Sequence, residues 1–454
     1  MEELRTQEEI KNYFLNVIEE FKSDKCEVHP YDLAQDLQKL RDLSDEDYEF
    51  VCKKIPSELF AEILCEMPNY VQEEISEVLS KRKIANITSI MDSDDASMLI
   101  HNISQNDEEA AQTILSKLDD EEKQIIEHLN SFDDDVAGAY MQSEIFSVKL
   151  NENIKATLLR LKKQKENDEL DNIFHAHVID DNGVFIGSIG LEELILFDSS
   201  LKYKDIPEDK FTNYSINHKA DIKDVVEMVT HYNLSALAIV DDENKLIGRI
   251  THDDIHDVIQ QLDTKQLYSL AGTNDESEQE ESMYLIGKNR ALWLGVNLIT
   301  AILASVVIGL FDATIQSLVA LAVLMPIVAS MGGNAGTQTL TVTVRQMALG
   351  EISYEDAKKI IYKEVVISLV NGFIFAFVIG FIAYLWFDIA LLGLVIAISM
   401  VINLFSAGFF GAVIPIFLQK RGIDPAIGST VILTTVTDVV GFFSFLGLAT
   451  LILL

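Results

Sequence analysis

Four oxygen-bearing side chains stand close together in the last apolar stretch of the chain. Thr434, Thr435 and Thr437 directly precede Asp438, so hydroxyl, carbonyl and carboxylate oxygens can be presented along neighbouring turns of one helix. Oxygen ligands suit hard cations, and Mg²⁺ is commonly met by one or two carboxylates while it keeps several of its waters. If two subunits face each other, one Asp per subunit is sufficient, so these residue types predict a site that handles a hydrated dication.

Asp438 is the only ionisable side chain in residues 425–454, a run long and apolar enough to cross a bilayer. A charge at that depth is costly and is expected to face a protein interior or a water-filled pathway. A proton relay or an internal ion pair is the competing interpretation. No Lys, Arg or His lies in the predicted spans, which favours a cation pathway with Asp438 as its metal-contacting residue.

A second polar segment, residues 330–339, interrupts another apolar stretch and is rich in glycine, hydroxyl and amide groups. Such groups are costly against lipid and are tolerated where they line a cavity or pack on protein. We expect Asn334 and Gln338 to line the pathway. For Gly332 and Gly336, which form a GxxxG pattern, close helix packing and pathway lining are equally favoured.

Five apolar stretches follow the soluble part, each near the ~20 residues that span a hydrocarbon core. They cover residues 291–311, 318–344, 365–387, 389–419 and 426–454. Basic residues precede the first stretch and separate the second from the third and the fourth from the fifth. Because cytoplasmic loops are enriched in Lys and Arg, the N-terminus is expected in the cytoplasm and the C-terminus outside, in a bacterial-type inner (plasma) membrane.

The charge is unevenly distributed along the chain. Its net charge of −37 comes wholly from residues 1–287, where 64 Asp and Glu face 27 Lys and Arg. Such an acidic head is a poor candidate for nucleic acid, which selects Lys and Arg, and it suits cations. The three cysteines, Cys26, Cys52 and Cys65, have no pairing or zinc-binding pattern, and a reducing cytosol is expected.

The acidic head contains two kinds of unit. Residues 29–133 repeat short amphipathic pieces after Asp, Glu, Ser or Pro start signals, which predicts stacked helices of an α-solenoid. Residues 148–197 and 218–260 each read as helix, strand, acidic turn, strand and helix around a shared "DDxxxxIG" core. These paired α+β units resemble CBS domains, which dimerise and often bind adenine nucleotides. Binding of an adenine nucleotide here is left open.

The predicted order of parts is an acidic helical domain (residues 1–135), two CBS domains (136–200 and 201–260), a connecting helix with an acidic linker (261–287) and a five-helix transmembrane domain (288–454). Together with the strings "MPIVASMGGNAGTQTLTVTVRQMALGEI", "LTTVTDVVGFFSFLGLATL", "DDASML" and "DVAGAYM", this multidomain membrane architecture resembles the MgtE family of Mg²⁺ channels and transporters. The resemblance covers nearly the whole chain from residue 29 onward.

The resemblance implies a homodimer with its pore at the subunit interface, and Asp438 facing the hydrated ion. It also implies feedback, in which Mg²⁺ bound among acidic residues of the head closes the pore. By motif match the regulatory metal residues would be Asp94, Asp95, Asp254 and Asp257.

Other family positions differ in this chain. Asn233 stands at an acidic position of the second CBS domain, and Thr264-Lys265-Gln266 replaces the family's "TED" on the connecting helix. Some regulatory sites are therefore expected to be absent, shifted or weaker.

The leading functional hypothesis is passive Mg²⁺ entry gated by cytosolic Mg²⁺. One alternative is a broader carrier of Co²⁺, Ni²⁺ or Mn²⁺, and another is a membrane-anchored CBS sensor that reports to a partner protein. An enzyme is not expected, because neither a nucleophile with its base nor a catalytic metal spacing is present in the sequence.

Overall fold

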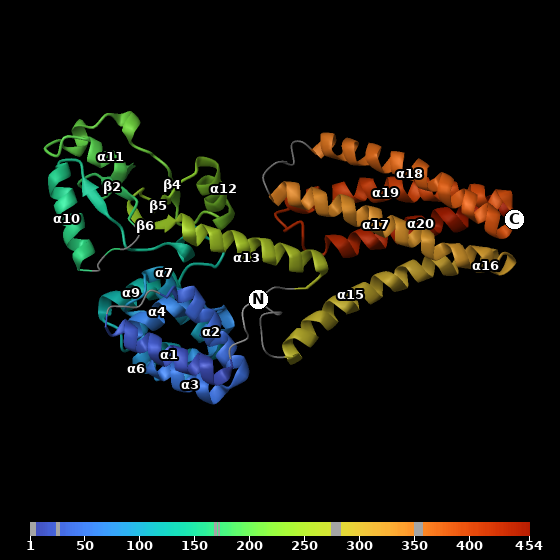
Figure 1. Ribbon diagram of the computed structural model, residues 1–454. Helices are drawn as coiled ribbons and strands as arrows, with labels where there is room; N and C mark the ends of the chain where they lie inside the picture. Colours follow the sequence, from blue (N-terminus) through green and yellow to red (C-terminus); the bar gives the residue numbers. More distant parts are fainter. Residues whose placement is uncertain (1–5, 24–27, 168–169, 171–172, 274–282, 349–356) are drawn as a thin grey trace. The chain divides into compact units, whose positions relative to one another are not determined.

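The computed structural model describes residues 6–23, 28–167, 170, 173–273, 283–348 and 357–454 (Figure 1). The chain divides into two compact units, Met1–Ile259 and Gln260–Leu454. Residues 274–282 of the expected acidic linker, and Cys26, lie outside the described residues.

Short helices form the first part of the N-terminal unit. They are α1 Gln7–Phe21, α2 Pro30–Leu43, α3 Asp45–Lys54, α4 Ser57–Cys65, α5 Asn69–Val78, α6 Lys81–Thr88, α7 Ser93–Asn106, α8 Glu108–Leu115 and α9 Asp120–Leu129. Several begin at a residue whose side chain accepts a bond from the first turn, such as Ser44 and Asp119. Their apolar faces share one core, in which Phe14, Leu37 and Phe60 are fully buried. The predicted helical N-terminal domain is confirmed.

Two small units with the same topology complete the N-terminal unit. The first contains η1 Ala137–Tyr140, β1 Ser147–Lys149, α10 Ile154–Glu166, β2 His175–Ile179, β3 Phe185–Gly190, α11 Leu191–Leu196, η2 Tyr203–Asp205 and η3 Glu208–Lys210. The second contains β4 Ser215–Asn217, α12 Ile222–Tyr232, β5 Ala236–Val240, β6 Leu246–Thr251 and the start of α13 His252–Ala271. In each, a short strand pairs in parallel with the first strand of an antiparallel hairpin. The paired CBS architecture is confirmed.

The acidic turns of the two hairpins have a structural role. Asp180 Oδ1 accepts the backbone amides of Asn182 and Val184 at 2.8 Å each, while Asp241 Oδ1 accepts those of Glu243 and Lys245 at 2.9 and 2.8 Å. These bonds stabilise the carboxylate form and hold the pKa of both Asp180 and Asp241 below its usual range. The first aspartate of each "DD" pair therefore closes its hairpin.

Within its described residues, the C-terminal unit contains the end of α13 and six further helices. These are α15 Met283–Gly309, α16 Asp312–Ser317, α17 Ala320–Ala348, α18 Ala357–Phe387, α19 Ala390–Lys420 and α20 Ser429–Leu453. Five of them, all except α16, are long and apolar enough to cross a membrane. The five predicted spans are confirmed, and the chain is a multi-pass membrane protein.

Two of the helices, α17 and α18, extend past the ends of their apolar runs on the side of the basic residues. α17 continues through Arg345 in its last turn, and α18 begins before Lys358, so these basic residues lie on helix ends and not in loops. The backbone of residues 330–339 remains α-helical throughout. α19 is the most buried span and packs against α17, α18 and α20 (Figure 1).

Candidate cation sites

Asp438 lies near the middle of α20, nine residues after the helix begins at Ser429. It is partly exposed, and no charged side chain in the described part of the chain acts on it. Gly428, directly before the first residue of α20, has a left-handed backbone with φ of +68°. This conformation turns the chain from the loop into the span. The structure thus leaves an unpaired carboxylate on the surface of a membrane-spanning helix.

The threonines next to Asp438 donate to their own helix. Thr434 Oγ1 donates to the backbone oxygen of Thr430 at 3.0 Å, Thr435 Oγ1 to that of Val431 at 2.6 Å, and Thr437 Oγ1 to that of Thr434 at 3.1 Å. Their oxygens retain lone pairs that can accept hydrogen bonds from the waters of a hydrated ion. Thr434 and Thr435 are partly exposed, as this role requires.

Thr437 was predicted to present its hydroxyl to the cation pathway beside Asp438, and the structure places it elsewhere. It is 0% exposed, because it shares the buried face of α20 with Leu433 and Gly441 at a spacing of four residues. Within one protomer Thr437 is therefore a packing residue.

The two sides of α17 separate the roles of its polar segment. Asn334 and Gln338 are exposed one turn apart, and Asn334 Nδ2 donates to Ser330 Oγ at 3.4 Å. Gly332 and Gly336 are buried. A Cβ added at Gly336 would come 3.1 Å from the side chain of Leu433 on α20. Packing is thus the role of the two glycines, while the two amides remain available to solvent or a ligand.

Arg345 lies on the same side of α17 as Asn334, because eleven residues make three turns of an α-helix. Its Nη1 donates to Asp263 of α13 at 2.6 Å and to Gln266 Oε1 at 3.5 Å. The two side chains of the Asp263–Arg345 ion pair are about half exposed. Sequence reasoning missed this contact, since nothing in the sequence pairs these two residues.

A second bond joins the end of α13 to the membrane helices. Thr430 Oγ1 donates to the backbone oxygen of Leu270 at 3.0 Å, and the Leu270 side chain packs on a buried cluster that includes Leu340 and Leu433. Lys265 is exposed and does not join these contacts. The part of α13 within the C-terminal unit therefore rests on the ends of α17 and α20.

The four head residues expected to bind metal lie in one neighbourhood. Asp94 and Asp95 are in the first turn of α7, while Asp254 and Asp257 are in the first two turns of α13. Gln142 links two of them, because its Nε2 donates to Asp94 Oδ2 at 3.2 Å and to Asp254 Oδ2 at 3.3 Å.

Burial and the repulsion of neighbouring carboxylates disfavour the charged form of Asp94 and Asp95. Burial, followed by the charge of Asp95 and then that of Asp254, raises the pKa of Asp94 well above its usual range. Burial raises the pKa of Asp95 to about 6, against a hydrogen bond from Cys65 Sγ at 3.3 Å that lowers it. A cation placed here would relieve this repulsion.

The cluster is not a closed metal cage. Across the described residues, no three Asp, Glu, His or Cys side chains stand close enough to hold a metal ion together. Asp254 Oδ2 also accepts the hydroxyl of Thr251 at 2.5 Å and its amide at 3.1 Å, which anchors this carboxylate at the start of α13. The structure brings the four residues near one another without converging them.

Asn233 ends α12 with a left-handed backbone, φ of 50°. Asparagine tolerates this conformation better than most residues, so its side-chain type suits the turn. The amide is exposed and carries no charge.

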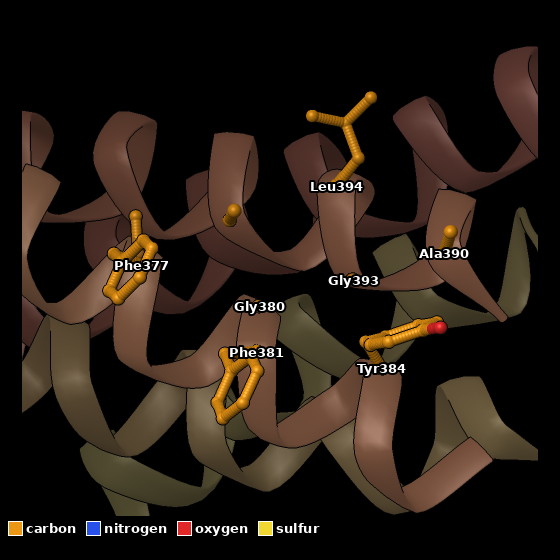
Figure 2. Close-up of a pocket in the computed structure, with 9 residues that line it drawn as sticks. Phe377, Gly380, Phe381, Tyr384, Ala390, Gly393 and Leu394 are labelled. Atoms are coloured by element: carbon orange, nitrogen blue, oxygen red, sulfur yellow. The ribbon is translucent and has the colours of Figure 1, made fainter. Parts of the chain in front are cut away.

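An apolar groove of about 350 Å³ lies between α18 and α19 (Figure 2). Gly380 and Gly393 let the two helices approach there, with Phe377, Phe381 and Tyr384 lining the opening (Figure 2). The lining has no carboxylate, so the groove does not suit a dication.

Comparison with protein families supports the architecture. The family model "MgtE: Divalent cation transporter" matches residues 325–448, "MgtE intracellular N domain" matches residues 28–135, and "CBS domain" matches residues 204–261. The first covers Asn334, Gln338 and Asp438, and the second covers Asp94 and Asp95.

Curated proteins match along most of the chain. "Magnesium transporter MgtE" of Thermus thermophilus is 26% identical over 429 residues, which are 94% of each chain. The protein of the same name from Bacillus subtilis is 26% identical over 434 residues, 95% of this chain and 94% of its own. That from Enterococcus faecalis is 28% identical over 73% of this chain and 72% of its own.

Among solved structures, "the soluble part of a magnesium transporter" is 24% identical and covers 57% of this chain and 99% of its own, with a TM-score of 0.48. The family models, the curated relatives and the five spans lead to one conclusion. The chain belongs to the MgtE family of divalent cation transporters, and it is a transporter and not an enzyme.

Proposed function

We propose that this protein mediates passive Mg²⁺ entry across a bacterial-type inner membrane, with Asp438 as the carboxylate that meets the hydrated ion. The observation that carries the proposal is the unpaired, partly exposed Asp438 in mid-span. Charge at that depth is retained where it serves a function. Curated relatives named magnesium transporters support Mg²⁺ as the transported ion.

The pathway is completed by a second copy of the chain. One protomer offers a single mid-span carboxylate, with the amides of Asn334 and Gln338 on α17 and the hydroxyls of Thr434 and Thr435 on α20. Two such surfaces facing each other would supply two carboxylates and a ring of neutral oxygens. This set suits Mg²⁺ with its waters retained.

The arrangement of basic residues supports an orientation with the head in the cytoplasm. Arg345, Lys358 and Lys420 lie at the helix ends of two connections, whereas Asp312 and Asp388 mark the connections on the other side. A negative interior would then drive the dication inward with about 4.6 kcal/mol per 100 mV, twice the single-charge value. No coupled ion is required by this driving force.

Cytosolic Mg²⁺ would act on the head as the closing signal. Like charges about 4 Å apart repel by about 4 kcal/mol at an effective dielectric near 20, so an ion that bridges Asp94, Asp95, Asp254 and Asp257 favours their approach. The raised pKa of Asp94 and Asp95 supports such repulsion in the unbound head. Because α13 begins in this cluster and ends on α17 and α20, its movement would reach the membrane helices.

An adenine nucleotide at the CBS pair would bind away from the acidic hairpin turns. Asp180 and Asp241 are used in the turns, and the adjacent Asp181 and Asp242 give both turns a negative surface that opposes phosphate. Lys219, a nearby cation, already pairs with Asp242 at 2.5 Å. No step of the proposed transport depends on a nucleotide.

The decisive experiment is Mg²⁺ uptake into proteoliposomes by wild type and Asp438→Asn. We expect the variant to lose uptake because the neutral amide cannot hold the ion's waters as tightly, while Asp312→Asn, on the short helix α16, retains it. An Asp438→Asn protein that is folded and takes up Mg²⁺ at the wild-type rate would refute the proposal. Absence of flux in the wild type would favour the membrane-anchored sensor.

Selectivity is tested in the same vesicles. Equal uptake of Co²⁺, Ni²⁺ and Mg²⁺ would favour the broader carrier. Oxygen ligands without thiolate or imidazole near Asp438 favour Mg²⁺ instead.

The gating proposal is tested by patch currents at increasing cytosolic Mg²⁺. Asp254→Asn with Asp257→Asn should raise the Mg²⁺ concentration needed for closure, because two of the carboxylates that would bind the bridging ion are removed. Asp253→Asn is the matched control, because its carboxylate is exposed beside His252. Unaltered Mg²⁺ sensitivity in the double variant would remove these residues from the gate.

A further inference from the structure

Asn403 lies at the centre of the membrane unit, where three helices meet. It is on α19 and is 0% exposed. A Cβ added at Gly332 of α17 would come 2.2 Å from Asn403 Nδ2, and one added at Gly441 of α20 would come 2.9 Å from the same atom. The amide therefore fits between two helix backbones that carry only hydrogen at these positions.

The two ends of this amide differ in their bonding. Nδ2 donates to the backbone oxygen of Val328 at 2.7 Å. That oxygen lies on α17, two residues after Pro326. Oδ1 is buried and accepts no hydrogen bond from the residues that the structure describes.

Fold stability alone does not account for an asparagine here. A buried acceptor without a partner is destabilising, and an apolar side chain at this position would remove both that cost and the desolvation of the amide. Two polar neighbours on α19 behave differently. Ser399 and Ser406 donate to carbonyls of their own helix, at 2.8 and 2.9 Å. Asn403 instead bonds to another helix.

The contacts of Asn403 lie close to the residues of the proposed pathway. Gly332 is two residues before Asn334, and Gly441 is three residues after Asp438. Asn403 itself is fully buried and does not reach the exposed side of either helix. Its influence on an ion would therefore act through the positions of α17 and α20.

We propose that Asn403 is a positioning residue that sets the separation of α17 from α20, and with it the distance between the Asn334 amide and the Asp438 carboxylate. This inference rests on the proposed transport function. A hydrated dication contacts both groups, so a change in separation alters how well an ion of given size is held. The apparent KM and the discrimination between dications should respond more than the maximal rate.

The test is Asn403→Leu in proteoliposomes, with uptake measured against Mg²⁺ concentration and against Co²⁺ as competitor. An interhelical side-chain hydrogen bond corresponds on average to a roughly threefold, and at most a roughly twentyfold, change in an equilibrium, so the KM for Mg²⁺ should rise within that range. The thermal midpoint is measured alongside, to establish that the variant is folded. Ser399→Ala, one turn away on α19 and equally buried, should leave KM unchanged.

Wild-type KM and wild-type Co²⁺ competition in folded Asn403→Leu would overturn the inference. Asp438→Asn in the same experiment separates the two proposals. If Asp438→Asn loses uptake while Asn403→Leu is normal, only the positioning role fails. If Asp438→Asn is normal, the pathway itself is wrong.

A second pair of variants covers the case in which Asn403→Leu does not fold. Gly332→Ala drives a methyl group into the Asn403 amide, and the double variant Gly332→Ala with Asn403→Ala removes that collision. We expect the double variant to fold and still show a raised KM, because the bond to Val328 is absent. Return of the wild-type KM would mean that Asn403 only fills space, which would overturn the proposal.

Discussion

At the scale of single residues, the buried His177 links the first CBS unit to pH. It is 2% exposed on β2, and its Nδ1 lies 2.8 Å from Ser188 Oγ. Burial, followed by the nearby His175 and Arg249, lowers the pKa of His177 to about 3. The folded protein therefore holds this imidazole neutral at pH values where an unfolded chain, with a His pKa near 6.5, binds a proton.

Acidification should consequently destabilise the protein through His177. Between about pH 6.5 and 3 the unfolded state binds a proton at His177 that the folded state does not. The free energy of unfolding therefore falls by about 1.4 kcal/mol for each unit that the pH falls. Urea unfolding at a series of pH values measures the slope. His177→Gln should lose this part of the slope and the exposed His231→Gln should keep it. Equal slopes in wild type and His177→Gln would contradict the prediction.

Two adjacent glycines of α17 should differ in their tolerance of a methyl group. A Cβ at Gly332 meets the Asn403 amide, whereas one at Gly333 meets nothing within 4 Å in the described chain. Gly332→Ala is expected to cost about 1–3 kcal/mol of stability through overpacking, and Gly333→Ala less than about 1 kcal/mol. Thermal unfolding in detergent compares the two variants. Equal midpoints would show that the Asn403 side chain moves aside without a cost in stability.

At the scale of elements, the contacts of α13 with α17 and α20 define its proposed role in gating. Its C-terminal half carries Thr264, Lys265 and Gln266, and Asp263 pairs directly with Arg345. An ion pair that is half exposed contributes about 0.2–1 kcal/mol and weakens with salt. Part of the attachment of α13 to the membrane helices is therefore direct and independent of a metal ion.

Breaking that pair should make closure need more Mg²⁺. Asp263→Asn should raise the Mg²⁺ concentration for half-closure by up to about fivefold, given the ~1 kcal/mol limit for such pairs. The charge swap Asp263→Arg with Arg345→Asp should restore it, and the exposed Lys265→Gln is the control. Patch currents at low and high NaCl measure the effect. A swap that fails to restore closure would indicate that Arg345 acts by another contact.

At the scale of the whole molecule, the proposed pathway needs a second protomer. The exposed amides of Asn334 and Gln338 and the partly exposed Asp438 face outward from one chain. A polar stripe facing lipid would be costly, so it is expected to be covered by an identical stripe around water.

Cross-linking in native membranes tests this arrangement. Gln338→Cys treated with a short bis-maleimide should yield covalent dimers, because the two stripes face each other. Tyr362→Cys, 73% exposed on α18, and the unmodified chain with its own cysteines are the controls. Cross-linking through position 362 but not 338 would place the subunit interface on another helix.

Several parts of the architecture could be predicted because their signals are local. Five long apolar runs, the two "DDxxxxIG" repeats and the amphipathic pieces at α2, α4, α5, α7 and α9 each contain their own signal. The helices α1, α3, α6 and α8 were not identified individually. They are short or highly charged, and tertiary burial of residues such as Phe14 stabilises them.

The contacts that assign roles to individual residues could not be predicted. Arg345 and Asp263 are 82 positions apart, and Asn403 and Val328 are 75 apart. Likewise Thr437 and Asp438 are adjacent in sequence but lie on different sides of α20, one buried and one partly exposed. Such assignments depend on which helices pack together, and apolar periodicity in a membrane span does not specify its neighbours.

By itself the sequence determined the number of spans, the acidic head with its paired CBS units, and the chemical type of the candidate cation ligand. These properties follow from composition and short-range spacing, which act before any tertiary contact forms. Only the tertiary structure decided that Gly332 packs on Asn403, that α13 bonds to α17 and α20, and that four head carboxylates lie near one another without converging. These arrangements depend on distances between residues that are far apart in the chain, and tertiary packing sets those distances.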